Sequence, residues 1–116
     1  MYKELIVFQK MYDLVLYLHP AVAKFPKNER FTLGQEIENQ SLYILKLIMR
    51  INTIYGERVS FVKELSQEFD VLSTYSHLAY DLRFLSAKQY GLIIEKIGEI
   101  MTICQGWLKS SKGKSE

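Results

Sequence analysis

Very few side chains in this sequence are of the types that hold metal ions or carry out catalysis. The histidines are His19 and His77, and the single cysteine is Cys104. A helical bundle that binds two iron ions needs a glutamate three residues before each metal-binding histidine. Leu16 and Thr74 occupy these positions here. The sequence therefore predicts no metal site of this type and no cofactor.

Familiar catalytic motifs are also absent from the chain. It contains no His-Glu-x-x-His, no pair of cysteines, no phosphate-binding loop and no Gly-x-Ser-x-Gly. Some four-helix ribonucleases place an arginine shortly before a histidine, but no arginine stands within reach before His77. We therefore expect a protein that is not an enzyme. In it, His77 lies on a helix surface or at an interface, and Cys104 is buried.

Basic residues are the remaining candidates for binding chemistry. The chain has 15 Lys and Arg against 13 Asp and Glu, which gives a formal net charge of +2. This balance permits contact with phosphates but does not require it. The candidates for binding nucleic acid or a protein partner are Arg83, Lys46, Arg50, Arg58, Lys88, Lys109, Lys112 and Lys114.

The elements that position these side chains are predicted to be helices. Apolar residues recur at steps of three and four, most clearly between residues 62 and 82, and no stretch alternates with a strand's period of two. In the last helix the apolar row is Tyr90, Ile94, Ile97, Met101, Cys104 and Leu108. Breaks fall at Pro26, Gly56 and Ser86. Long helices joined by short loops pack as antiparallel neighbours, so the predicted fold is all-α, an antiparallel up-and-down four-helix bundle.

The bundle is expected to occupy residues 1–108, and residues 109–116 to form a basic, flexible tail. With 116 residues, of which 48% are hydrophobic, the chain fits one domain with a core. Ser86 begins a Ser-Ala-Lys-Gln sequence that fits a capping box at the start of the last helix. Pro20 lies inside the first apolar segment, so we expect a kink there or a helix that ends near Leu18.

The sequence predicts neither a membrane span nor a secretory signal. No segment approaches the roughly 18 uninterrupted apolar residues that a span needs. The first residues lack the long apolar run and the cleavage site of a signal peptide. A single cysteine fits a reducing compartment. We therefore expect a cytoplasmic protein that has no membrane partner.

The first two helices carry more apolar surface than one buried face needs. In the first helix a second apolar line, Leu5, Phe8, Tyr12 and Val15, runs beside the line expected to face the core. In the second, only Lys46 and Arg50 interrupt the apolar run from Leu42 to Ile51. Surplus apolar faces favour a homo-oligomer. The alternative is that wide stripes simply belong to a tightly packed bundle.

Two glycines, Gly91 and Gly98, share one face of the last predicted helix. Each costs about 1 kcal/mol relative to alanine in a helix interior. Close approach by a neighbouring helix or subunit would offset that cost. The alternative is that both are exposed and tolerated.

The predicted topology sorts the basic residues into the two ends of the bundle. One end would hold Lys3, Arg50, Arg58, Lys109, Lys112 and Lys114, and the other Lys24, Lys27, Arg30, Arg83 and Lys88. Nearby acidic residues partly cancel both groups, so on one subunit they are expected to be ordinary solvated helix ends. In a ring, repetition of the same charges around an axis would make a platform for nucleic acid.

Several short stretches stand out along the chain: Tyr17 to Ala21, Phe25 to Lys27, the Leu-Arg-Phe-Leu sequence of Leu82 to Leu85, and the closing segment from Ile97 through Trp107 to the basic residues after it. Together they resemble the accessory variability determinant (Avd) proteins of diversity-generating retroelements. The stretch from Phe25 to Phe31 also resembles the related four-helix proteins encoded within ribosomal-RNA intervening sequences.

The first resemblance implies a four-helix bundle that assembles into a homopentameric ring. Such a ring binds a reverse transcriptase and its template, RNA or RNA/DNA, and supports mutagenic cDNA synthesis. Arg83 matches the arginine of the family's Leu-Arg-Phe-Leu piece, whereas Ala79 stands where members often have a second arginine. The alternatives are an intervening-sequence-type bundle with a structural or RNA-associated role and no polymerase partner, or a small hydrolase or nuclease.

Overall fold

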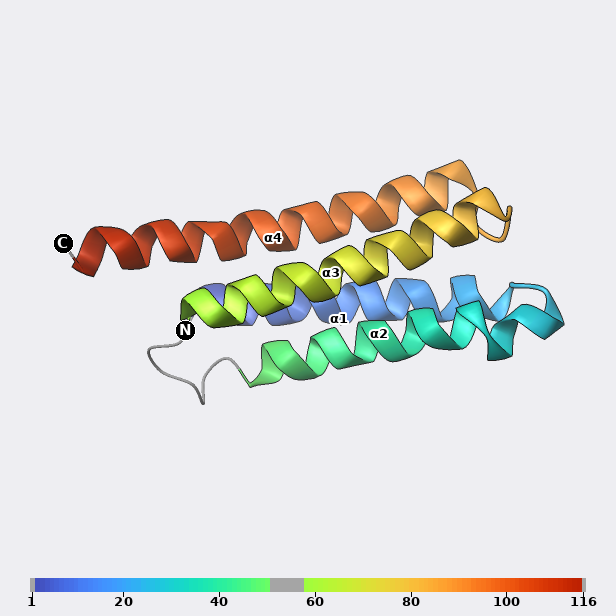
Figure 1. Cartoon of the computed structure of the whole chain (residues 1–116), viewed down its shortest axis with the longest axis horizontal. Coiled ribbons are helices and arrows are strands. Elements are labelled where there is room, and N and C mark those ends of the chain that lie inside the picture. Colours follow the sequence, from blue (N-terminus) through green and yellow to red (C-terminus); the bar gives the residue numbers. More distant parts are fainter. Residues whose placement is uncertain (1, 51–57, 116) are drawn as a thin grey trace.

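The protein is a bundle of four long helices. The computed structural model describes residues 2–50 and 58–115, and the side chains within 4–50 and 59–107. Its elements are α1 (Tyr2–Ala23), the 3-10 helix η1 (Lys27–Phe31), α2 (Leu33–Met49), α3 (Arg58–Asp81) and α4 (Ala87–Ser115). Helix α1 packs against α2 and α4, and α3 packs against the same two helices. The predicted all-α, antiparallel up-and-down four-helix bundle is confirmed (Figure 1).

Each helix turns a row of apolar side chains toward one shared core. The buried rows are Val7, Met11, Leu14 and Leu18 in α1, Ile37, Ile44 and Ile48 in α2, Val62, Leu65, Phe69 and Leu72 in α3, and Ile93, Ile97, Ile100, Cys104 and Trp107 in α4. Most neighbours along a row are three or four residues apart, which is the spacing of one helix face. The core therefore runs along the bundle axis, in a molecule that measures 52 × 24 × 20 Å.

The row that α4 buries differs from the row expected from the sequence. Ile93 and Ile100 are fully buried, whereas Tyr90, Ile94 and Met101 are only half-buried. Apolar residues stand side by side at several positions of this helix, so periodicity alone does not decide which one faces inward. Ile97 and Cys104 of the expected row are buried, and packing against α1 and α3 selects the neighbours Ile93 and Ile100 in place of Ile94 and Met101.

Helix α1 does not end near Leu18, so that alternative is wrong. Pro20 lies within its last turn, and the helix continues to Ala23. A proline has no N–H to donate to the carbonyl four residues earlier, which here belongs to Leu16. The loss is confined to one hydrogen bond close to the helix end, where the chain is about to turn.

The connection between α1 and α2 is tight. The backbone of α2 approaches the end of α1 so closely at Gly34 that an added Cβ atom would lie 2.8 Å from Cγ1 of Val22 and 3.1 Å from the carbonyl oxygen of Glu29. Only glycine fits this approach without a shift of its neighbours. Helix α2 ends at Met49 with Arg50 as its C-cap, and the expected break at Gly56 lies outside the described residues.

The predicted capping box at the start of α4 is confirmed. The backbone N–H of Ser86 donates to Oε1 of Gln89 at 2.8 Å, and the N–H of Gln89 donates to Oγ of Ser86 at 3.1 Å. The helix then runs to Ser115, through most of the segment expected to form a tail. The boundary after residue 108 and the flexibility of residues 109–116 stay predictions. Among the described residues, no helix is both long and apolar enough to span a bilayer.

The glycines of α4 are open to their surroundings within the described part of the chain. No atom lies within 4 Å of a Cβ placed on Gly91 or on Gly98. A neighbouring helix of the same chain therefore does not explain these two glycines. Contact with another subunit and simple tolerance of exposed glycine are the two explanations that stay open.

Replacement by alanine should have opposite effects on stability at the crowded Gly34 and at the open Gly91. Gly34→Ala should lower the free energy of unfolding by about 1–3 kcal/mol, because the new methyl group overpacks a filled site. Gly91→Ala should raise it by up to about 1 kcal/mol, because alanine is the better helix former and meets no atom of its own chain. Urea denaturation of both variants measures the difference. Effects of the same sign would contradict this account of the α1–α2 connection.

Candidate nucleic-acid and partner interface

The turn between α3 and α4 has a Schellman geometry that places an arginine in the left-handed region. Arg83 has a φ of 68°. Its N–H donates to the carbonyl oxygen of Tyr80 at 2.9 Å, and the N–H of Phe84 donates to that of Ala79 at 2.8 Å. Glycine is the usual residue at this position because it has no Cβ. Any other residue in this conformation is strained, by roughly 1–2 kcal/mol.

Packing of the residues after Arg83 explains why the turn adopts this form. The Phe84 ring lies against the Phe25 ring at the end of α1, with 5.5 Å between centroids, and Leu85 is buried. In contrast, Leu82 and Arg83 are exposed. The Leu-Arg-Phe-Leu sequence therefore joins a half-buried Phe84 and a buried Leu85 to an exposed cation, and the chain reverses at Arg83.

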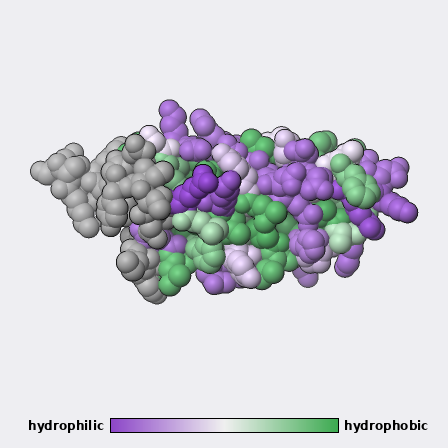
Figure 2. Space-filling view, turned by 90° about the horizontal axis from the view of Figure 1, so that it is seen from below, coloured by the Kyte–Doolittle hydropathy of each residue, from purple (hydrophilic) through white to green (hydrophobic). Residues whose placement is uncertain are grey.

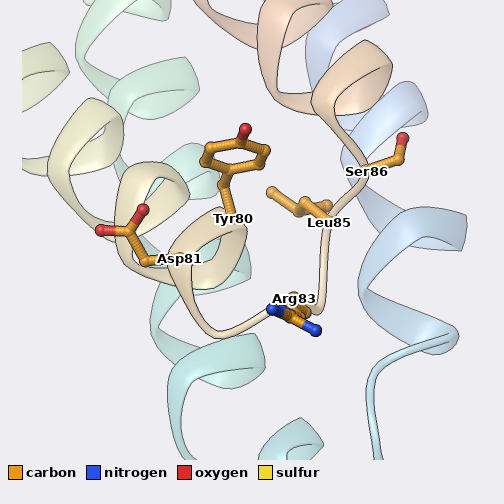
Figure 3. Close-up of a pocket in the computed structure, with 5 residues that line it drawn as sticks. All are labelled: Tyr80, Asp81, Arg83, Leu85 and Ser86. Atoms are coloured by element: carbon orange, nitrogen blue, oxygen red, sulfur yellow. The ribbon is translucent and has the colours of Figure 1, made fainter.

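A hollow of about 560 Å³ opens beside this turn. Tyr80, Asp81, Arg83, Leu85 and Ser86 line it. Figure 3 shows the Tyr80 ring and the Leu85 side chain projecting into the space between α3 and the start of α4, while Arg83 lies at the bottom of the turn. An exposed cation and an aromatic ring thus border the same space.

Further cations lie at the end of the bundle that holds Arg83. Lys88 is in the first turn of α4, and Lys24 and Lys27 are on the α1–α2 connection at the same end (Figure 1). All are exposed, and within the described side chains no ion pair involves Arg83, Lys88, Lys24 or Lys27. Their charges are therefore available to an anionic partner.

The remaining candidates lie toward the opposite end. Lys46 and Arg50 are exposed on the last turns of α2. Arg58 begins α3, and Lys109, Lys112 and Lys114 belong to the last turns of α4, where side chains are outside the described part. At 1.5 Å per residue, Lys88 and Lys109 are about 30 Å apart along α4. The eight candidates thus form two groups rather than one site, and their binding roles stay predictions.

An apolar face covers the outside of α1 and α2. Large exposed side chains on it are Leu5, Tyr12, Leu16, Leu42, Tyr43 and Met49. Figure 2, which views the bundle from the α2 side, shows apolar side chains gathered in the middle of this face. A groove of about 330 Å³ runs between the two helices there, with Leu16 and Leu42 on its walls.

The apolar residues that α1 exposes to solvent differ in part from those expected from the sequence. Leu5 and Tyr12 are exposed as expected, but Phe8 and Val15 are half-buried and pack against the core. Sequence periodicity did not single out Leu16, which is 57% exposed. Its position follows only once the neighbours of α1 are known, because α1 is apolar around most of its circumference.

Cys104 and His77 lie in different surroundings. Cys104 is fully buried in the core, and desolvation raises the pKa of its thiol to about 12. His77 is exposed, with Nε2 placed 3.5 Å from Oδ2 of Asp81. Among the described residues, no group of three or more His, Cys, Asp or Glu side chains is arranged to hold a metal ion. The site is thus a set of surfaces on a helical bundle.

The family of this helical bundle follows from comparison with known proteins. A family model described as bAvd-like matches residues 5–111, which include most of α1 and α4 and all of α2 and α3. The chain therefore belongs to the bAvd-like family, and the resemblance to Avd proteins is confirmed. The relation to intervening-sequence proteins is not shown. A comparison with curated proteins gives no match. Membership indicates an accessory protein of the diversity-generating retroelement type, a family that is generally non-catalytic.

The effect of backbone strain at Arg83 on stability can be measured separately from the effect of its charge. Arg83→Gly should raise the free energy of unfolding by about 1 kcal/mol, because glycine adopts the left-handed conformation without strain. Arg83→Gln removes the same charge but keeps the Cβ, so it should leave stability nearly unchanged. Chemical denaturation compares the two variants. Equal stabilities would show that the backbone at this turn is not strained.

The buried thiol predicts a specific dependence of stability on pH. The pKa of Cys104 rises from 9.0 to about 12 on folding, so the stability it contributes is complete below pH 9 and is lost as the pH rises toward 12. The expected slope is at most about 1.4 kcal/mol per pH unit. Cys104→Ala should have a flatter profile than the wild type over this range. Parallel profiles would contradict the burial of a protonated thiol.

Proposed function

We propose that this chain is a non-catalytic, oligomeric accessory protein that binds a retroelement reverse transcriptase and its template, RNA or RNA/DNA. In this role it supports mutagenic cDNA synthesis in the cytoplasm. The observation that carries the proposal is the match to the bAvd-like family over residues 5–111.

The proposed assembly is a ring of identical subunits, a homopentamer by family resemblance. The apolar face of α1 and α2 is its proposed contact surface, because large apolar side chains such as Leu16 and Leu42 are exposed there. Burial of this face against a second copy would remove its apolar area from water. The ends of each bundle would then lie in a repeated arrangement around the ring.

The proposed nucleic-acid contacts are the cations at the bundle ends. One group contains Arg83 and Lys88 beside the α3–α4 turn, and the other contains Lys46, Arg50, Arg58, Lys109, Lys112 and Lys114. On one subunit the net charge is only +2. Repetition around a ring would multiply these cations and strengthen the attraction to phosphates.

The oligomeric state is tested by light scattering at micromolar concentration. We expect the wild type to exceed the monomer mass of 13.6 kDa, and Leu16→Glu to reduce the mass, because it places a charge in the proposed contact. Val59→Glu on α3 is the matched control, since Val59 is 59% exposed and Leu16 is 57% exposed. A wild type that is strictly monomeric would refute the ring.

The nucleic-acid contact is tested by the salt dependence of RNA binding. Neutralising Lys109, Lys112 and Lys114 together should weaken binding and flatten its dependence on salt, by nearly one unit of slope for each phosphate that the protein no longer binds. Lys10→Gln is the control, because Lys10 pairs with Glu99 at 3.0 Å near the middle of the bundle. An unchanged slope in the triple variant would remove the end of α4 from the proposed contacts.

A further inference from the structure

Three aromatic rings form an exposed stack beside the α3–α4 turn. The Tyr80 and Tyr90 rings are nearly parallel, with an angle of 12° and 5.0 Å between centroids. His77 covers Tyr90 at 5.7 Å and 27°. Tyr90 is half-buried, while Tyr80 and His77 are exposed. Two of the three rings are therefore exposed to solvent beside the turn.

Tyr80 belongs both to this stack and to the lining of the hollow at the turn. Tyr90 covers one face of the Tyr80 ring, and Tyr80, but not Tyr90, lines the hollow. Leu85 adds an apolar wall, and Arg83 lies at the edge (Figure 3). A flat ligand that enters the hollow would thus meet an aromatic ring and a nearby cation.

We propose that this hollow binds an unpaired base of single-stranded RNA, stacked on Tyr80 at the end of the Tyr80–Tyr90–His77 stack. The adjoining phosphates lie toward Arg83 and Lys88, the two exposed cations that flank the turn. Stacking on aromatic rings combined with cations along the backbone is the general mode of single-strand binding. The inference rests on the proposed function and assigns it a base-binding site.

Charge within the hollow favours this orientation of the nucleotide. Asp81 is the one acid among the described residues that line it, and its carboxylate lies 3.5 Å from Nε2 of His77. A phosphate beside Asp81 would be repelled, so the base enters the hollow and the phosphates stay outside. The carboxylate is also an acceptor for a base amino group or a ribose 2′-hydroxyl, and the hydroxyl is specific to RNA.

A stacked base and an apolar side chain of a protein partner would depend on different properties of Tyr80. A protein contact of that kind depends on the apolar area of Tyr80, which leucine would largely supply. A stacked base depends on a flat π face, which phenylalanine retains and leucine lacks. Substitutions at Tyr80 therefore distinguish the two ligands.

The test compares two labelled strands of about 12 nucleotides each, one of single-stranded RNA and one abasic with the same phosphate charge. The wild type should bind the RNA about tenfold more tightly than the abasic strand, because only the RNA offers a base to Tyr80. Tyr80→Leu should lose most of that preference and keep its affinity for the abasic strand. Tyr80→Phe should retain the preference.

Phe31→Leu is the control variant, because Phe31 on η1 is an exposed aromatic residue that lies neither in the hollow nor on the apolar face of α1 and α2. Helical circular dichroism and light scattering confirm that each variant is folded and assembled like the wild type. Preference for RNA that survives Tyr80→Leu would overturn the inference while leaving the proposed function in place. A wild type that binds neither strand at low salt would overturn RNA binding itself.

Discussion

Burial of one apolar row from each of four helices is the constraint on which the rest of the structure depends. The largest buried side chains, among them Trp107, Phe25 and Phe69, fill the space along the axis. Within the described part of the chain, this packing also buries the one thiol, Cys104, and so raises its pKa. The exposed candidates for recognition lie on the outer faces of the helices and at the ends of the bundle.

The same constraint shapes the α3–α4 turn. Phe84 packs against Phe25 and Leu85 enters the core, so the two residues before them must reverse the chain within a very short span. Arg83 takes the left-handed conformation that this reversal requires. Arg83, whose left-handed backbone conformation lowers stability, thus lies at the rim of the hollow. Strained residues of this kind are typical of positions where function rather than stability selects the side chain.

Much of the fold was predictable because it depends on local sequence. Helical periodicity, the capping box at Ser86 and the burial of Cys104 follow from the spacing and types of nearby residues. The buried row of α4 and the exposure of Leu16 did not follow, because both helices carry apolar residues on adjacent faces. The choice between those faces is made by the neighbouring helices, which are far away in the sequence.

The candidate site was only partly predictable for the same reason. The sequence singled out Arg83 and the other cations, and the topology divides them between the two ends. The stack of Tyr80 on Tyr90 joins two helices, so its partners lie ten residues apart across a turn whose geometry had to be known. The only local sign of this stack in the sequence is the pair His77 and Tyr80, which stand three residues apart just before the turn.

The claim that function resides on the assembled surface is tested most directly by reconstituting cDNA synthesis. The reaction contains the reverse transcriptase of the same retroelement and its template RNA, with or without this chain. We expect the cDNA yield to depend on the wild-type protein and to fall with Arg83→Gln, although that variant remains folded. A yield that is unchanged when the protein is omitted would contradict the account.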